Sequence, residues 1–216
     1  MRLLKAVSVC VAGCALLAEP CLGQQSGSFD NSWFWGVKGG VNSFSIPGAI
    51  HKSAPTWGLD WMITRTHGGL YVSADQSFFT RTVTSADSSS TSGKRQVLIN
   101  DLRRVGFGGL VFPPPYGRLR AYAGLGAAIS IIGSAIAQND SSGGAPSQQF
   151  IDRTDKARSR ASILAMAGTQ LQVGRTAFFM QETWLPSGSE FLVPSTMSFF
   201  ELGLRYNLGS SKESAH

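Results

Sequence analysis

The segment Phe199-Phe-Glu-Leu-Gly-Leu-Arg-Tyr-Asn-Leu208 alternates strictly between two sets of side chains. The even-numbered set is apolar or aromatic: Phe200, Leu202, Leu204, Tyr206 and Leu208. The odd-numbered set is mostly polar: Phe199, Glu201, Gly203, Arg205 and Asn207. A β-strand sends successive side chains to opposite faces, whereas a helix would scatter both sets around its circumference. The segment therefore predicts a strand with one apolar face and one polar face.

The same alternation with a period of two recurs upstream and predicts seven more strands. They cover residues 33–42, 57–64, 70–78, 104–111, 118–129, 162–173 and 177–185. The 177–185 segment is nearly continuous in its apolar pattern. Within it we place Glu182 on the inner face only because a carboxylate that faces lipid is costly.

The connections between these eight segments are of two kinds, long and short, and they alternate from the first one. The long ones span 43–55, 81–96, 132–160 and 186–198, and the short ones span 66–69, 113–117 and 173–175. Membrane barrels have short turns at the periplasmic end and longer loops at the outer end. The sequence therefore predicts an all-β fold, an eight-stranded antiparallel up-and-down transmembrane β-barrel.

Composition supports this fold class over a soluble domain. Charged residues make up 15% of the chain, against about 25% in typical soluble domains. The formal net charge of +6 is mild, and the sequence contains no nucleic-acid-binding module, phosphate-binding glycine loop or metal-ligand cluster. We therefore expect no cofactor, no metal and no nucleic-acid partner.

The first residues predict a secretory signal peptide. Arg2 and Lys5 precede an apolar stretch, and Cys21-Leu-Gly23 provides a small-x-small cleavage site. We expect a signal peptide at 1–23, the barrel at 24–208 and a disordered polar tail at 209–216. All three cysteines then lie in the signal peptide, which excludes disulfides and cysteine zinc sites from the mature chain. A membrane anchor at this end, or a single transmembrane helix over 121–137, explains less of the sequence.

Three of the predicted strands resemble a known family. The motifs are Trp35-Gly-Val-Lys-Gly-Gly-Val41, Arg120-Ala-Tyr-Ala-Gly-Leu-Gly126 and Phe200-Glu-Leu-Gly-Leu-Arg-Tyr-Asn-Leu208. They resemble the OmpA/OmpX-type eight-stranded outer-membrane proteins. The resemblance implies a monomer in the cell outer membrane that contacts its lipid and lipopolysaccharide, with an extracellular partner that remains unknown. One departure is that family barrels usually end on an aromatic residue, whereas here Leu208 is followed by eight more residues.

The alternation also predicts which charged side chains point into the barrel. They are Lys38, Asp60, Asp75, Arg104, Arg120, Glu182, Glu201 and Arg205. Because the interior of an eight-stranded barrel is just wide enough for side chains to fill it, we expect a packed structural network. An ion pathway and a catalytic carboxylate pair are the alternatives. The expected ion pairs are Arg205 with Glu182 and Glu201 with Lys38.

Aromatic residues near strand ends or on outward faces predict interfacial girdles. They are Trp33, Trp35, Trp57, Trp61, Phe78, Phe79, Trp184, Phe199 and Tyr206. The third long loop holds a basic run, and its cations are candidates for contact with a polyanion such as lipopolysaccharide. They are Arg153, Lys156, Arg158 and Arg160. The alternative is a solvated loop base whose charges pair with one another.

These patterns favour a non-enzymatic outer-membrane barrel with a role in surface interaction or envelope integrity. A barrel enzyme acting on lipid A is one alternative, and it requires His51 beside a serine such as Ser53 and a carboxylate at the outer rim. A soluble lipocalin-like barrel is the other, and it requires an apolar interior and a polar exterior. We predict no catalytic residues.

Overall fold

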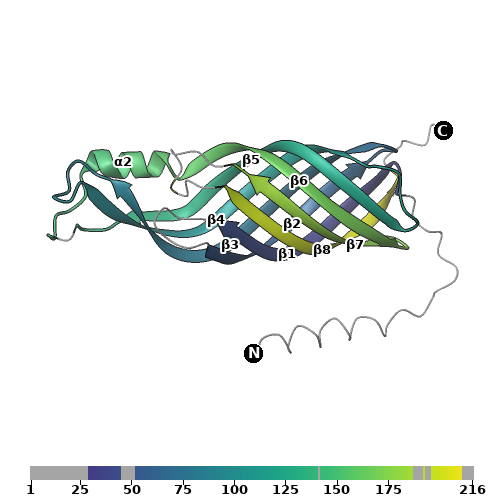
Figure 1. The fold of residues 1–216 in the computed structure, drawn as a ribbon, viewed down its shortest axis with the longest axis horizontal. Coiled ribbons are helices and arrows are strands. Elements are labelled where there is room, and N and C mark those ends of the chain that lie inside the picture. The colour runs from purple at the N-terminus through teal and green to yellow at the C-terminus, as the bar shows by residue number, and fades with distance from the viewer. Residues whose placement is uncertain (1–28, 45–51, 141, 187–191, 193–195, 211–216) are drawn as a thin grey trace, which may run out of the picture.

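The computed structural model describes residues 29–44, 52–140, 142–186, 192 and 196–210. Within them the chain forms a closed antiparallel barrel in which each strand pairs with its neighbours in sequence and β8 closes on β1 (Figure 1). The strands are β1 (Ser32–Phe44), β2 (Lys52–Thr64), β3 (Gly68–Ala86), β4 (Lys94–Val111), β5 (Leu119–Ala137), β6 (Ser159–Val173), β7 (Thr176–Leu185) and β8 (Met197–Ser210). The predicted fold class is confirmed, and β8 continues two residues past the predicted end at Leu208.

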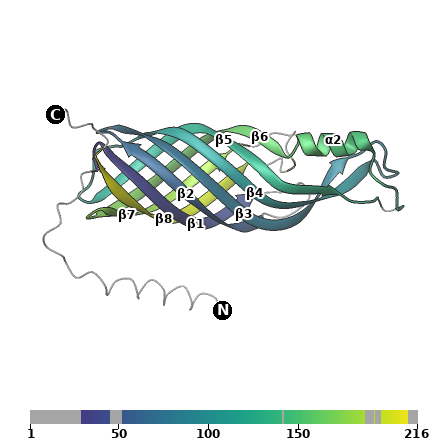
Figure 2. The same ribbon diagram turned by 180° about the vertical axis from the view of Figure 1, so that it is seen from behind.

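The register shows how strongly the strands are inclined. A row of paired residues that starts at Ile131 on β5 passes through Arg103, Gln76 and Trp57 on β4, β3 and β2. The row continues around the barrel and returns to β5 at Ala121, ten residues away from its start. A stagger of this size tilts the strands by about 40° from the barrel axis. The diagonal course of the strands is visible in Figure 2.

The outer face of the barrel is apolar along every strand. Leu125 and Ile163 are 70% and 68% exposed, and Trp35 and Leu204 also have large exposed surfaces. Apolar surface of this extent is typical of a lipid-facing belt and would be an aggregation liability in water. The observed polarity is the reverse of that required by a lipocalin-like soluble barrel, so that alternative is wrong.

Most of the predicted girdle residues lie on this outer face, but two do not. Trp33, Trp35, Trp57, Phe78, Trp184 and Tyr206 are exposed, and Trp61 is half-buried. Phe79 and Phe199 are instead buried inside the barrel. Their positions follow from strand geometry, because Phe79 shares a face with Ser77 and Phe199 shares a face with Glu201.

The barrel is extended at its long-loop end. β3 and β4 continue as a hairpin up to a turn at 87–93, so most of the predicted 81–96 loop is strand. The third long loop contains a helix that the sequence analysis missed, α2 (Gln148–Lys156). α2 and the hairpin protrude beyond the barrel on the same side (Figure 1). We call residues 80–100, 133–140 and 142–158 the outer unit.

The opposite end of the barrel carries three short connections, at 65–67, 112–118 and 174–175. They agree with the predicted short turns. The predicted signal peptide (1–23) and nearly all of the predicted tail lie outside the described residues. No helix among the residues described is long and apolar enough to cross a membrane.

Candidate functional site

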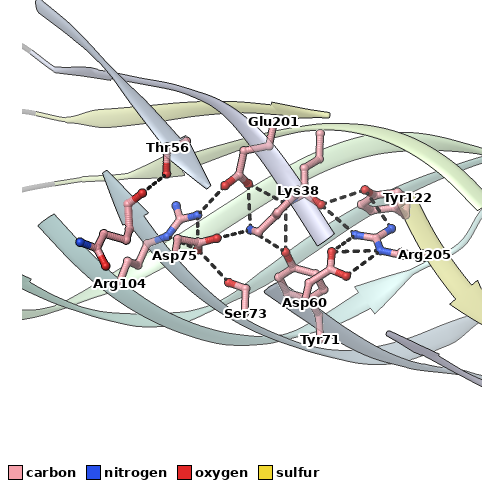
Figure 3. Close-up of polar contacts among 12 residues, drawn as sticks. Lys38, Thr56, Asp60, Tyr71, Ser73, Asp75, Arg104, Tyr122, Glu201 and Arg205 are labelled. Atoms are coloured by element: carbon pink, nitrogen blue, oxygen red, sulfur yellow. Dashed lines mark hydrogen bonds and ion pairs between the residues drawn. The ribbon is translucent and has the colours of Figure 1, made fainter. Parts of the chain in front are cut away.

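Six charged side chains occupy the middle of the barrel interior, and Figure 3 shows them pointing toward one another. We call them the lumen network: Lys38, Asp60, Asp75, Arg104, Glu201 and Arg205. Each is at most 5% exposed. Three carry a positive and three a negative charge, so the formal charges cancel. This balance is the condition under which ions are tolerated in a dry interior.

The first half of the lumen network joins two cations to two carboxylates. The ammonium of Lys38 lies 2.7 Å from Asp75 Oδ1 and 3.0 Å from Glu201 Oε2, so the predicted pair of Lys38 with Glu201 is confirmed. Arg104 Nη2 lies 2.6 Å from Asp75 Oδ2 and 3.2 Å from Glu201 Oε1. The guanidinium of Arg104 also lies over the Phe199 ring, 3.7 Å from its centroid.

The second half is centred on Arg205. Its Nη2 donates to Asp60 Oδ2 at 2.8 Å, and its Nε donates to Oδ2 at 3.0 Å and to Oδ1 at 3.3 Å. Its remaining donors reach Gln170 Oε1 at 3.1 Å and Gln181 Oε1 at 3.0 Å. The guanidinium lies over the Phe179 ring, 3.7 Å from its centroid. Arg205 is therefore held by a bidentate ion pair, two amides and an aromatic face, an arrangement that fixes its orientation.

Hydrogen bonds from uncharged side chains connect the two halves. Gln181 Nε2 donates to Glu201 Oε2 at 2.9 Å and to the Tyr71 hydroxyl at 3.0 Å. The hydroxyl of Tyr122 donates to Gln181 Oε1 at 3.0 Å. With these residues and Gln170, all eight strands contribute a side chain to the interior cluster. The lumen network therefore ties the whole barrel together.

Inward-facing glycines make room for these large side chains. A Cβ atom added at Gly36 would lie 2.1 Å from Asp60 Oδ1, and one added at Gly58 would lie 2.2 Å from Asp75 Oδ1. A Cβ added at Gly168 would lie 2.6 Å from the Tyr122 ring. Each glycine sits directly across from the residue it accommodates. These glycines are thus part of how the lumen network is packed.

Apolar layers lie on both sides of the lumen network. Toward the short turns, the ring of Phe29 packs against Phe34 and Phe112, with centroids 5.6 and 4.9 Å apart. Toward the long loops, Phe44 and Phe79 are in ring contact and are accompanied by buried aliphatic side chains such as Leu102. This layering is consistent with a structural plug, and it does not favour the ion pathway or the catalytic carboxylate pair.

Two predicted lumen residues lie elsewhere. Glu182 is on the outward face of β7, where its Oε1 accepts a hydrogen bond from Ser198 Oγ at 2.8 Å, so its predicted inward position is wrong. Its neighbour Gln181 points inward instead. Arg120 is half-buried near the short-turn end, 3.4 Å from Asp30 and over the Phe29 ring. It therefore makes no ion pair with the lumen network.

The outer unit is organised around Arg95, a buried residue that the sequence analysis missed. Arg95 Nε lies 2.5 Å from Asp87 Oδ2, and Nη1 donates to the carbonyls of Gln138 and Gly144 at 2.9 and 2.8 Å. This residue joins the β3–β4 turn to the loop that precedes α2. A side chain with charge-assisted bonds to two separate loops holds both in one arrangement. The polar composition around Arg95 gave no signal of this role.

Hydrogen bonds lower the pKa values of two carboxyl groups in the outer unit. The hydroxyl of Ser142 and the backbone N–H of Gly144 donate to Asp140 at 2.7 Å each and lower the pKa of that carboxyl to about 2. The pKa of Asp87 is also below its ordinary value because Arg95 and Ser89 donate to it. Both groups therefore favour the ordered loops when they are ionised.

The four predicted polyanion-binding residues do not form one patch. Arg153 and Lys156 are exposed on α2. Arg158 is 3.3 Å from Asp155 and donates to the carbonyl of Gly133 at 2.7 Å, so this residue follows the self-paired alternative. Arg160 is half-buried at the start of β6.

The positions of the described serine and histidine residues give little support to the hypothesis of an enzyme that acts on lipid A. Ser53 faces outward on β2, while His51 lies outside the described residues. His67 is in the short β2–β3 connection, at the other end of the barrel. Among the described residues there is no group of three histidine, cysteine or acidic side chains that could hold a metal ion.

Comparison with solved structures identifies similar folds. Neisserial surface protein A matches with a TM-score of 0.54 at 8% identity, covering 82% of this chain and 97% of that one. The attachment invasion locus protein of Yersinia pestis matches with a TM-score of 0.50 at 13% identity, covering 83% and 99%. No protein-family model and no curated protein matches the sequence. The closed barrel of eight antiparallel strands, its apolar belt and these neighbours agree: the chain has the fold of the eight-stranded outer-membrane β-barrels.

Proposed function

We propose that this chain is a non-enzymatic protein of the cell outer membrane that presents the outer unit to the surroundings on a closed barrel. The observation that carries the proposal is the division of the molecule into an apolar-faced barrel and a folded polar unit at one end. The barrel acts as the membrane anchor. The protein is a monomer, and outer-membrane lipid and lipopolysaccharide surround its barrel. The segment 1–23 acts as the secretory signal peptide.

The lumen network supports an anchor rather than a channel. The side chains of Lys38, Asp75 and Glu201 have at most 1% of their surface exposed. Charged groups that are buried and paired in this way bind one another rather than a passing ion. We therefore assign the lumen network to stability and shape.

The outer unit supports a role in surface interaction. Extended loops beyond a membrane barrel cost entropy to order, and here Arg95 and the buried ring of Phe150 hold them together. One structural neighbour is named for attachment and invasion and another as a surface protein. These names support the same kind of role for this chain.

Two measurements on the purified protein test the proposal. Reconstituted into planar bilayers beside a general porin as positive control, it is expected to produce no ion-conductance steps. Incubated with lipid A in micelles, it is expected to leave every acyl chain in place by mass spectrometry. Steady conductance would contradict a lumen that is blocked by side chains, and deacylated lipid A would contradict the non-enzymatic role.

A further inference from the structure

A cleft lies in the outer unit between α2 and the β3–β4 turn. Its volume is about 470 Å³, within the range of small-ligand sites. Ser88 from the turn and Ser147, the N-cap of α2, contribute hydroxyls to its wall. The lining is mostly polar, which distinguishes this cleft from the apolar pockets that take drug-like molecules.

One face of α2 supplies four more polar side chains to this cleft, beside Asp87 of the turn. Gln149, Asp152, Arg153 and Lys156 all line it. Their spacing of three, one and three residues places them on one side of a helix. The buried residues of α2 are Thr154 and Phe150, and Phe150 also lines the cleft. The amphipathic helix therefore turns an amide, a carboxylate and two cations toward the same space.

The charges around the cleft favour an anion. The carboxylate of Asp87 is paired with Arg95, so one carboxylate, Asp152, and two cations, Arg153 and Lys156, remain at the cleft and leave a net positive charge. Arg153 uses Nη2 to reach the carbonyl of Ala86. Lys156 has no ion pair or hydrogen bond within the described part of the chain. An exposed ammonium beside a guanidinium is a suitable partner for one anionic group.

The height of the cleft above the membrane indicates where the anion comes from. Phe78 is the last aromatic residue of β3 on the lipid-facing side, and Asp87 lies nine residues further along the chain. Nine residues of extended strand span about 30 Å along the strand, or about 23 Å along the barrel axis at a tilt of about 40°. The cleft therefore lies well beyond the level of lipid phosphates, as the protruding position of α2 in Figure 1 also indicates.

We propose that this cleft binds an acidic saccharide of one or two rings. The anionic group lies between Arg153 and Lys156, and the sugar hydroxyls bond with Ser88, Ser147 and Gln149. Hydroxyl-rich rings match the polar lining, which offers both donors and acceptors. The inference rests on the proposed function in one respect, because it requires the outer unit to face outward.

The test is an NMR titration of the isotope-labelled, full-length mature protein in detergent micelles. Two disaccharides of equal ring number are compared, one carrying a carboxylate and a sulfate and the other neutral. The acidic disaccharide is expected to shift the amide signals of α2. Lys156→Gln is expected to weaken its binding by about fivefold, the worth of one exposed ion pair. Lys94→Gln removes an equal charge at the base of the turn, outside the cleft, and is expected to change nothing.

A steric variant keeps every charge and tests the cleft itself. Ser88→Trp fills the space and is expected to abolish the shifts while the rest of the spectrum stays unchanged. Equal binding of the neutral disaccharide, equal loss in Lys94→Gln and Lys156→Gln, or no binding of the acidic disaccharide would overturn the inference. These outcomes are independent of conductance and of lipid A cleavage, so this inference and the proposed function fail separately.

A competition experiment then distinguishes two sources of an acidic saccharide, the lipopolysaccharide of the membrane and a saccharide outside the cell. Lipopolysaccharide with an acidic core that displaces the disaccharide assigns the ligand to the membrane's own saccharide. Lipopolysaccharide that leaves the disaccharide bound assigns the ligand to a saccharide outside the cell.

Discussion

Arg205 on β8 and Asp60 on β2 form a bidentate ion pair although their strands are not neighbours. β1 lies between these strands, and the residue in register with both partners is Gly36. Because Gly36 has no side chain, the guanidinium reaches across β1 to a carboxylate oxygen at 2.8 Å. The pair therefore depends on a residue that takes no part in it chemically.

Substitution of Gly36 by alanine is expected to destabilise the barrel by about 1–3 kcal/mol, as overpacking in a dense core does. The added Cβ would lie 2.1 Å from Asp60 Oδ1 and 2.8 Å from Arg205 Cγ. Urea unfolding in lipid vesicles, followed by tryptophan fluorescence, measures the change. Gly109→Ala is the control, since its Cβ would meet no atom within 4 Å. Equal stability of the two variants would show that Gly36 is not needed for the pair.

Asp60→Asn is expected to cost about 3–5 kcal/mol, because it leaves the buried charge of Arg205 without its counter-ion. Glu182→Gln is expected to cost far less, since Glu182 faces outward and contacts Ser198. The same unfolding measurement compares them. A larger loss of stability in Glu182→Gln would identify Glu182, the partner predicted from the sequence, as the counter-ion of Arg205.

The contrast between Asp60 and Glu182 shows what sequence patterns determine in this barrel. Period-two alternation predicted all eight strands and placed most interior charges correctly, because bilayer and lumen impose opposite polarity on the two faces. On β7 the apolar pattern is nearly continuous, so a cost argument placed Glu182 inward and missed Gln181. Arg205 was paired with an adjacent strand because sequence does not reveal that a glycine lets it reach further.

The outer unit was less predictable for another physical reason. Beyond the membrane no lipid enforces alternation, and the tract Ser85–Gly93 has the composition of a loop. Its flanks nevertheless continue as β3 and β4, because Arg95 and α2 stabilise them. Of the four cations in the basic run, only Arg153 and Lys156 line the same cleft.

Acid is expected to loosen the outer unit before it affects the barrel. The pKa of Asp140 is about 2 in the folded loop, below its value of about 3.9 in an unfolded chain. Its contribution is therefore complete above about pH 4 and is lost as the pH falls toward 2, and Asp87 acts in the same direction. Limited pepsin digestion should cut beside Phe150, an aromatic residue that is buried in the ordered outer unit, increasingly across this interval. Asp140→Asn should flatten the dependence, and an unchanged profile would contradict the assignment.

The lipid-facing belt predicts a depth-dependent effect of charge. Leu204→Arg, in the middle part of β8, is expected to cost about 2–4 kcal/mol, whereas Leu208→Arg near the strand end should cost about 0–1 kcal/mol. Both leucines are exposed on the outer face. Unfolding in vesicles measures the difference. Equal tolerance at the two positions would mean that no bilayer surrounds this face.

Cysteine labelling of cells that express single-cysteine variants tests the central claim most directly. The cysteines of the chain are at 10, 14 and 21, so Ser88→Cys, His67→Cys and Leu125→Cys each add one outside the predicted signal peptide. A bulky membrane-impermeant maleimide should label Ser88→Cys in intact cells. It should label His67→Cys only after the outer membrane is permeabilised, and Leu125→Cys only after unfolding. Labelling of His67→Cys but not Ser88→Cys in intact cells would contradict the orientation, and labelling of Leu125→Cys in the folded protein would contradict the lipid-facing barrel.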